Sequence, residues 1–441
     1  MRFFKRKKKL LIIGLDGVPY EMIRNFCDCS LMPNLKSVFA SGKLVKMAVG
    51  LPEISSVSWS SFMTGTNPGN HGIFGFTELD TGTYEYRFPD FRDLRAPTFF
   101  DELGAKKKRS VIINLPSTYP VREIKGVLLA GFVAIDLKKA VYPLTYLPFL
   151  KNSGYMIDID AGKGKERKSE FMSDLHTALK IRKKAADFFW EKEKWDVFMF
   201  TITGTDRLHH FLFDAYSDEN HRFHQDFLNY YEAIDDLIGD FFSRISENDE
   251  FETILLSDHG FGPIQSEIYL TPILKKHGFY DAEPGEGKSL ETIAGNARAF
   301  ALDPSRIFIH QKGKYPRGSV AREDYDTIRQ EIKQLFEEYR INNRKVIKKV
   351  YFKEEIYSSR FLDRAADIVL LSNPGFDLKG GLNKKDEYGN SHFTGMHLRD
   401  NAFFFTGKPE LLPEKMTIFS AKDIIFKSLD LKPPLSIPDA L

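Results

Sequence analysis

The chain has 441 residues, 42% of them hydrophobic and 14% aromatic, enough to bury a core larger than the simplest single domain holds. Lysine and arginine number 63 against 61 aspartates and glutamates, and this balance argues against a nucleic-acid binder that relies on a strong positive field. The two cysteines, Cys27 and Cys29, are too close in sequence for an unstrained bridge, so we expect reduced thiols in a cytoplasmic protein.

The N-terminus carries a basic run over residues 5–9, followed by an apolar run over residues 10–15. The apolar run is too short for a signal peptide, and Asp16 interrupts it without a cleavage site. No later stretch reaches the roughly 18 apolar residues of a membrane span. We expect the basic run to be a solvated arm, and the alternative is a weak contact with an anionic membrane surface.

Continuous apolar runs recur along the chain and predict buried strands. They cover residues 10–15, 110–114, 126–130, 197–202, 253–256, 368–371 and 402–405. Helical patterns lie between several of them, including residues 168–192 and 223–246. This alternation predicts an α/β fold with a mostly parallel central sheet, covered on both faces by helices.

Two regions break the alternation. Residues 263–349 hold the turn-rich segment 284–287 and a charged helical pattern over residues 322–339, which predict an inserted subdomain. Residues 142–168 are expected to form a lid excursion near the entrance of a site. Apart from these, residues 1–441 are expected to form a single, discontinuous catalytic domain.

Polar side chains follow three of the predicted strands. Asp16 follows the first, Asp206 and His210 follow the strand at 197–202, and Asp258 and His259 follow the strand at 253–256. Ligand sites in parallel sheets collect outside the carboxyl ends of the strands, so these segments are expected to meet.

The spacing of Asp206 and His210 suits chelation of one metal ion, because residues four apart share one face of a helix. His209 points about 100° away on that helix and is expected to pack or to support a ligand. His397 precedes the strand at 402–405, and His392 is a nearby competitor for the same role.

Taken together, these segments supply three carboxylates and three imidazoles, a donor set that suits two zinc-like ions. A pair of ions a few ångströms apart clamps the attacking and leaving oxygens of a phosphoryl transfer. The six residues are Asp16, Asp206, His210, Asp258, His259 and His397.

A hydroxyl-rich segment, residues 55–61, leads into a turn over residues 67–72. A serine at the start of a helix can be ligated by a metal ion, which lowers the pKa of its hydroxyl so that no histidine base is needed. The helix N-terminus would also offer backbone N–H groups to a phosphate. The alternative for one isolated serine is an ordinary helix cap.

The ordered series of motifs resembles the alkaline phosphatase superfamily. It is most similar to the type I phosphodiesterase/nucleotide pyrophosphatase branch, and within it to the phosphohydrolase/phosphomutase-like members. The resemblance runs from about residue 9 to residue 408 and implies an α/β/α sandwich of the alkaline phosphatase type with insertions. The motifs are Leu15-Asp16-Gly17, the Ser55 segment with Thr64-Gly65 and His71-Gly72, Asp206 with His210, Asp258-His259-Gly260 and His397.

The resemblance assigns the donors to two divalent ions, most simply zinc, although manganese or iron would fit the same ligands. One ion would be held by Asp206, His210 and His397. The other would be held by Asp16, Asp258 and His259, with Ser55 as a further ligand.

Ser55 is also the nucleophile that the resemblance implies, and its attack on phosphorus would form a covalent phospho-serine. Ser56 is the alternative at this position. Nucleotide pyrophosphatases carry an asparagine where this chain has Phe76, so another group must stabilise the charge of the transition state. Arg207 is the candidate, and its alternative role is an ion pair with a surface carboxylate.

The implied function is a two-metal-dependent hydrolase of small-molecule phosphate esters, either a phosphodiesterase or a phosphomonoesterase. One alternative is a phosphomutase, in which the phospho-serine returns its phosphate to the same molecule. The other is a catalytically inactive, metal-stabilised binding protein. Sulfatases are a poor match, because Ser55 is not followed by their x-Pro-x-Arg run. Nucleic-acid binding is not expected, and the oligomeric state is left open.

Overall fold

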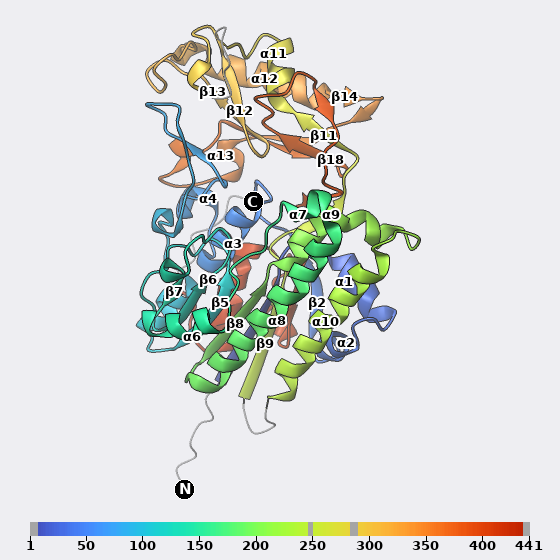
Figure 1. Cartoon of the computed structure of the whole chain (residues 1–441). Helices are drawn as coiled ribbons and strands as arrows, with labels where there is room; N and C mark the ends of the chain where they lie inside the picture. Colours follow the sequence, from blue (N-terminus) through green and yellow to red (C-terminus); the bar gives the residue numbers. More distant parts are fainter. Residues whose placement is uncertain (1–7, 246–249, 283–289, 435–441) are drawn as a thin grey trace. The chain divides into compact units, whose positions relative to one another are not determined.

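The computed structural model describes residues 8–245, 250–282 and 290–434 (Figure 1). The described residues divide into two compact units, the first formed mainly by residues within 8–66, 90–262 and 392–434 and the second mainly by residues within 67–89 and 263–391. The predicted insertion at 263–349 lies within the second unit, and the excursion at 142–168 lies within the first. The turn-rich segment 284–287 and residues 5–7 of the basic run lie outside the described residues.

The first unit is built on an eight-stranded sheet with β1 (Lys8–Leu15) near its centre. Five neighbouring strands run parallel, in the order β9-β1-β8-β5-β6, and three further strands, joined by antiparallel pairing, complete the edges. The parallel partners are β9 (Glu250–Leu256), β8 (Val197–Ile202), β5 (Ser110–Leu115) and β6 (Gly126–Ala130). The strands at the edges are β7 (Val141–Tyr142), β21 (Ala402–Thr406) and β2 (Lys43–Met47).

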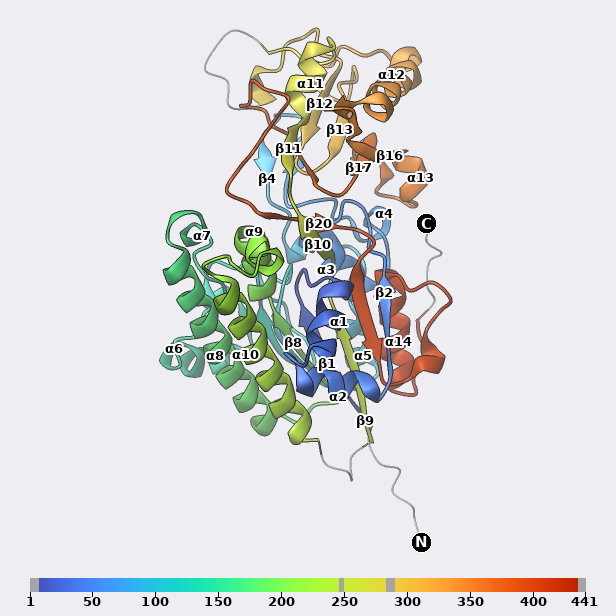
Figure 2. The same ribbon diagram turned by 90° about the vertical axis from the view of Figure 1, so that its right-hand side faces the viewer.

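Helices cover both faces of this sheet, as Figure 2 shows. Residues 11, 13 and 15 of β1 share one apolar core with α1 (Tyr20–Asp28), α2 (Pro33–Ala40), α8 (Lys168–Lys192) and α10 (His224–Ser243). The long α8 buries residues at helical spacing, including Phe171, Leu175, Ala178 and Phe189. The opposite face carries α3 (Ser55–Thr64), α5 (Phe99–Ala105) and α14 (Ala421–Ser428). The predicted α/β/α sandwich is therefore confirmed.

The first unit also contains further elements outside this sheet. They are α6 (Leu147–Asn152), α7 (Lys163–Glu166), α9 (Gly204–Ser217), β10 (Gly260–Pro263) and β20 (Gly395–Leu398). Cys27 is buried and Cys29 exposed, and each is a free thiol, as their spacing predicted. None of the described helices combines the length and apolarity of a membrane span.

The second unit contains a four-stranded antiparallel sheet, in the order β12-β13-β17-β16, against which α12 (Tyr325–Glu338) packs. This sheet corrects the assignment of residues 368–371, which form part of β17 rather than a strand of the main sheet. An apolar run shows that a strand is buried, but not which sheet it joins. The four strands are β12 (Ala299–Leu302), β13 (Arg306–Ile309), β17 (Ile368–Ser372) and β16 (Ile347–Phe352).

The rest of the second unit consists of short elements. A three-stranded sheet joins β11 (Ser266–Tyr269), β18 (Phe376–Lys379) and β19 (Tyr388–Gly389). Two hairpins pair β3 (Glu78–Leu79) with β4 (Tyr86–Arg87) and β14 (Arg340–Ile341) with β15 (Arg344–Lys345). Three short helices are α4 (Pro68–His71), α11 (Leu270–Lys276) and α13 (Lys353–Ile356).

Candidate metal centre

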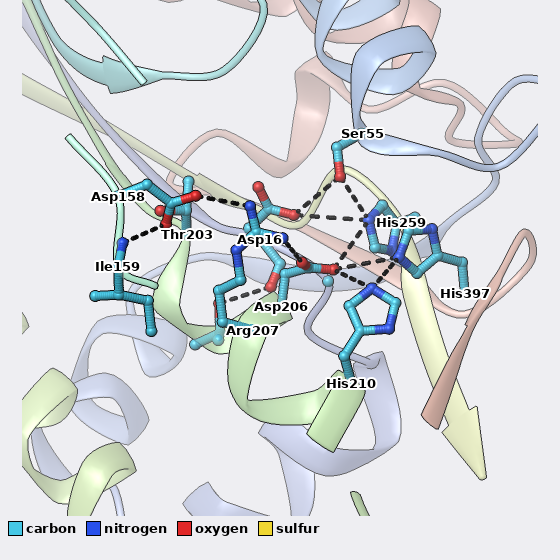
Figure 3. Close-up of polar contacts among 12 residues, drawn as sticks. Asp16, Ser55, Asp158, Ile159, Thr203, Asp206, Arg207, His210, His259 and His397 are labelled. Atoms are coloured by element: carbon cyan, nitrogen blue, oxygen red, sulfur yellow. Dashed lines mark hydrogen bonds and ion pairs between the residues drawn. The ribbon is translucent and has the colours of Figure 1, made fainter. Parts of the chain in front are cut away.

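The adjacent parallel strands β9, β1 and β8 bring the predicted polar residues together at their carboxyl ends (Figure 3). Asp16 follows the last residue of β1, and Asp258 and His259 follow β9. The helix α9 begins two residues after β8 and presents Asp206 and His210 on one face, one turn apart. The topology of the sheet therefore places five of the six predicted ligands in one place.

The sixth ligand and the predicted nucleophile arrive from other elements. Ser55 is the first residue of α3, and His397 lies on β20. The strand β20 pairs with β10, which directly follows the polar turn after β9, and this pairing carries His397 to the cluster. His392, the competing histidine, is exposed.

Two imidazoles converge on one oxygen of Asp206. The Oδ1 atom of Asp206 lies 3.2 Å from Nε2 of His397 and 3.4 Å from Nε2 of His210, and the two nitrogens are 3.0 Å apart. Nδ1 of His397 lies 3.0 Å from the carbonyl oxygen of Glu53, which fixes the ring and turns Nε2 inward. Anchoring of the second nitrogen by a carbonyl is the usual arrangement for a metal-binding histidine.

A second group gathers around His259. Its Nε2 lies 3.1 Å from Oγ of Ser55, 3.6 Å from Oδ1 of Asp16, 3.9 Å from Oδ1 of Asp206 and 3.5 Å from Oδ2 of Asp258. Nδ1 of His259 bonds to the carbonyl of the next residue at 3.0 Å, so Nε2 is again the inward atom. Oγ of Ser55 also lies 3.4 Å from Oδ1 of Asp16.

Supporting hydrogen bonds hold the carboxylates in place. The indole Nε1 of Trp59 donates to Oδ2 of Asp16 at 3.1 Å, and the Thr205 hydroxyl donates to the Asp16 carbonyl at 2.6 Å. The backbone N–H of Gly17 donates to Oδ1 of Asp258 at 3.1 Å, from a left-handed conformation with φ of 66° that favours glycine. Sequence reasoning missed Trp59, although its position one helical turn after the predicted nucleophile placed it on the same face.

Two residues next to the predicted ligands, His209 and Gly260, have structural roles. His209 is buried, with Nδ1 2.9 Å from the Gly17 carbonyl and Nε2 2.7 Å from the Tyr231 hydroxyl, and it packs in the core as its direction on the helix predicted. Burial lowers the pKa of His209 to about 3, so the ring is neutral. Gly260 allows Asn401 to pack closely against the backbone, because a Cβ at this position would lie 1.5 Å from Oδ1 of Asn401.

The electrostatics of the cluster follow from burying three carboxylates together. Burial, and then the charges of Asp258 and Asp206, raise the pKa of Asp16 well above its usual value. Burial disfavours the charge on Asp206 too, but His210 and His397 outweigh it and hold the pKa of that carboxyl well below its usual range. Burial lowers the pKa of His259 to about 4, which keeps its imidazole neutral and able to ligate a cation.

Arg207 lies beside the cluster, in contact with two carboxylates. Its Nη2 donates to Oδ2 of Asp158 at 2.7 Å, and its Nη1 lies 3.5 Å from Oδ2 of Asp206. The guanidinium also covers the ring of Phe132, 4.2 Å from the ring centre. Of its two predicted alternatives, an ion pair with a carboxylate is present, but Asp158 is largely buried and the pair adjoins the ligands. Sequence reasoning did not single out Asp158.

The residues fit divalent ions. Two unprotonated imidazole nitrogens 3.0 Å apart repel each other unless a proton or a cation lies between them, and Oδ2 of Asp258 is buried without a hydrogen-bond partner among the described residues. Two groups offer ligand atoms within 4.8 Å of one another, namely Asp206 with His210 and His397, and Asp16 with Asp206 and His259. Mixed nitrogen and oxygen donors of this kind suit zinc, and also manganese or iron.

The sequence of the chain matches one known protein family over most of its length. The sequence pattern of the type I phosphodiesterase/nucleotide pyrophosphatase family matches residues 10–397. The chain belongs to this family. It is accordingly a metal-dependent hydrolase of phosphate esters in general terms. No curated protein matches the chain by sequence.

Solved structures share the fold of this phosphodiesterase family member. Phosphonoacetate hydrolase from Sinorhizobium meliloti 1021, in complex with phosphonoacetate, is 18% identical with a TM-score of 0.64, over 96% of each chain. Murine ectonucleotide pyrophosphatase/phosphodiesterase 5, in complex with AMP, is 14% identical with a TM-score of 0.58, over 97% of this chain and 96% of that one. At these identities the similarity establishes the fold alone.

Proposed function

We propose that the protein hydrolyses small-molecule phosphate esters with two bound metal ions, through a covalent phospho-serine at Ser55. The observation that supports this most is the position of the Ser55 hydroxyl, 3.1 Å from Nε2 of His259 and 3.4 Å from Oδ1 of Asp16. The Ser56 hydroxyl is buried without a hydrogen-bond partner among the described residues, which favours Ser55 over its neighbour as the nucleophile.

The donor set divides between two ions. Bound there, divalent ions, with zinc as the first choice, would supply Lewis acidity that lowers the pKa of the serine hydroxyl and balances charge on the phosphoryl oxygens. One ion would be held by Asp206, His210 and His397. The other would be held by Asp16, Asp258, His259 and Ser55.

The start of α3 places backbone donors beside the nucleophile. The helix has no side-chain cap, and its third and fourth N–H groups, from Val57 and Ser58, bond to the Ile54 carbonyl. The N–H groups of Ser55 and Ser56 precede them in the first turn, where an anion is stabilised by the helix dipole. These groups would orient the phosphoryl group for attack by Oγ of Ser55.

Arg207 would contribute positive charge at the edge of the cluster. Its guanidinium is held 3.5 Å from Asp206 and can approach a phosphoryl oxygen without leaving the site. In this role Arg207 would stabilise the charge of the transition state. Phe76 cannot do so, because its apolar ring replaces the asparagine that nucleotide pyrophosphatases carry.

We also propose a cytoplasmic location for the protein.

Paired serine variants test the nucleophile. Purified Ser55→Ala protein should lose turnover of aryl phosphate mono- and diesters, assayed with zinc and with manganese, while its metal content stays near that of the wild type. Ser56→Ala is the matched control and should keep both. A Ser55→Ala protein with full activity beside an inactive Ser56→Ala protein would show that the assignment is wrong.

Two further measurements address the intermediate and its fate. Mass spectrometry of acid-quenched protein should find phosphate on the peptide that contains Ser55. In ¹⁸O-labelled water, hydrolysis gives phosphate labelled by solvent, whereas a mutase gives an isomerised product without release. Wild-type protein that binds metal but cleaves no ester would support an inactive binding protein instead.

A further inference from the structure

A buried arginine fixes part of the 142–168 excursion next to the metal centre. Nε and Nη2 of Arg182 donate to the carbonyls of Met156 and Ile157 at 2.9 and 2.6 Å, and Nη1 donates to the Thr203 hydroxyl at 2.9 Å. Arg182 comes from α8, and Thr203 lies just before α9. These bonds set the position of the following residue, Asp158, relative to the start of α9.

Asp158 uses that position to contact Arg207. The two side chains meet at 2.7 Å, and Figure 3 shows Asp158 on one side of the guanidinium and Asp206 on the other. Exposed fractions of 15% for Arg207 and 19% for Asp158 leave little water to screen the pair. Nε of Arg207 is buried with no hydrogen-bond partner among the described residues, so the guanidinium keeps one donor uncommitted.

Asp158 and Asp206 therefore oppose the charge on Arg207 before any substrate arrives, and Asp158 also lies 4.0 Å from Nη2 of the buried Arg182. A phosphodiester carries one negative charge, whereas a phosphomonoester carries two once its second proton, with a pKa of about 6, has dissociated. A guanidinium without a neighbouring carboxylate would attract the second negative charge of a monoester. A carboxylate fixed next to the guanidinium repels that second charge. The negative charge of Asp158 thus disfavours binding of the monoester more than binding of the diester.

We propose that Asp158 is a specificity-determining residue that, by neutralising Arg207, makes the site prefer singly charged diesters over doubly charged monoesters. The inference rests on the proposed hydrolase function and concerns its substrate class. In the alternative, Asp158 has a purely structural role and only holds residues 156–158 in place. Loss of that support lowers the rates for both kinds of ester alike and leaves their ratio unchanged.

The test compares two esters with the same leaving group, p-nitrophenyl phosphate and methyl p-nitrophenyl phosphate, at pH 8. Asp158→Asn keeps the shape of the side chain and removes its charge. The ratio of kcat/KM for monoester to that for diester should rise about tenfold, the order expected for one charge acting on another several ångströms away in a partly buried site. Metal content should stay at the wild-type value.

Asp160→Asn is the matched control. Asp160 lies two residues further along the same segment, is exposed, and bonds to the backbone N–H of Gly162 at 2.9 Å within its own turn. The same change of charge at this position should leave the ratio unchanged. A tenfold rise in the control would show that general surface charge causes the effect and would overturn the inference.

Equilibrium binding provides a readout that does not depend on turnover. In the Ser55→Ala background, calorimetry should show that Asp158→Asn raises the affinity for methyl phosphate relative to dimethyl phosphate by a similar factor. An unchanged preference in both assays would overturn the role of Asp158 while leaving the hydrolase proposal intact. Wild-type protein that cleaves neither ester would overturn the hydrolase proposal itself.

A second variant covers the case in which Asp158→Asn does not fold. Arg207→Gln removes the closest counter-charge of Asp158 and leaves it the Arg182 guanidinium, 4.0 Å away, so the monoester should become relatively worse and the kcat/KM ratio should fall about tenfold. A ratio that stays at the wild-type value in Arg207→Gln would equally overturn the inference.

Discussion

Trp59→Phe removes a single hydrogen-bond donor from the support of the metal centre. The indole N–H donates to Oδ2 of Asp16 at 3.1 Å, and the ring packs so tightly on β1 that a Cβ at Gly14 would lie 2.7 Å from its Cη2 atom. Phenylalanine retains the aromatic packing against β1 and leaves Oδ2 of Asp16 without this donor. The carboxylate is then free to rotate away from the position in which it faces Ser55 and His259.

The size of the effect follows from the kind of bond that is lost. A hydrogen bond to a charged group contributes about 1.5–3 kcal/mol. Loss of a group that orients a metal ligand costs about 10–100-fold in metal affinity, which is about 1.4–2.7 kcal/mol. We therefore expect the ion held by Asp16 to bind at least tenfold more weakly, and the ion held by Asp206, His210 and His397 to change much less.

Competition with a chromophoric chelator measures both affinities in one titration. The matched control is Trp195→Phe, because the Trp195 indole is also buried and its N–H also donates one bond, to the Trp190 carbonyl at 3.3 Å, away from the cluster. Both variants should lose some stability, but only Trp59→Phe should bind an ion more weakly. Equal metal affinities in the two variants would refute the role assigned to the Trp59–Asp16 bond.

Three further predictions concern the same centre. Asp258→Asn should lower metal content, measured by elemental analysis, and ester hydrolysis together, because it removes a charged ligand; full metal content with full rate would exclude Asp258 from the ligands. Chelation should lower the Tm in a scanning calorimeter by several degrees, and added zinc should restore it, because ions that bind only the folded state stabilise it; an unchanged Tm would contradict this. His209→Ala should lower the free energy of unfolding in urea by about 1–3 kcal/mol and leave metal content unchanged, because the ring bonds to Gly17 and Tyr231 rather than to an ion; a lost ion would contradict that assignment.

The sequence predicted the parts of the centre that depend on local order. Asp16 and Asp258 each follow a continuous apolar strand, and parallel neighbours align their carboxyl ends, so their meeting could be expected without coordinates. The helical spacing of Asp206 and His210 needed only the period of the helix. These arguments use a strand, a turn or one helical turn at a time.

The other parts of the site and the fold depend on pairing between distant segments. His397 reaches the cluster because β20 pairs with β10, and nothing in the spacing of residues 392–398 separates His397 from the exposed His392. Asp158 comes from an excursion whose path is set by Arg182, a long-range contact with no sequence signature. The run at 368–371 showed a buried strand, yet its partners β13 and β16 lie in the second unit.

The central claim is that six side chains bind two cations beside the Ser55 hydroxyl. Anomalous diffraction from crystals of the purified protein, recorded on either side of the absorption edge of the metal found by X-ray fluorescence, tests it most directly. The account predicts two anomalous peaks, one among Asp206, His210 and His397 and one among Asp16, Asp258 and His259, with Oγ of Ser55 next to the second. Metal-loaded crystals with no peak at either position, or with peaks only elsewhere on the chain, would contradict it.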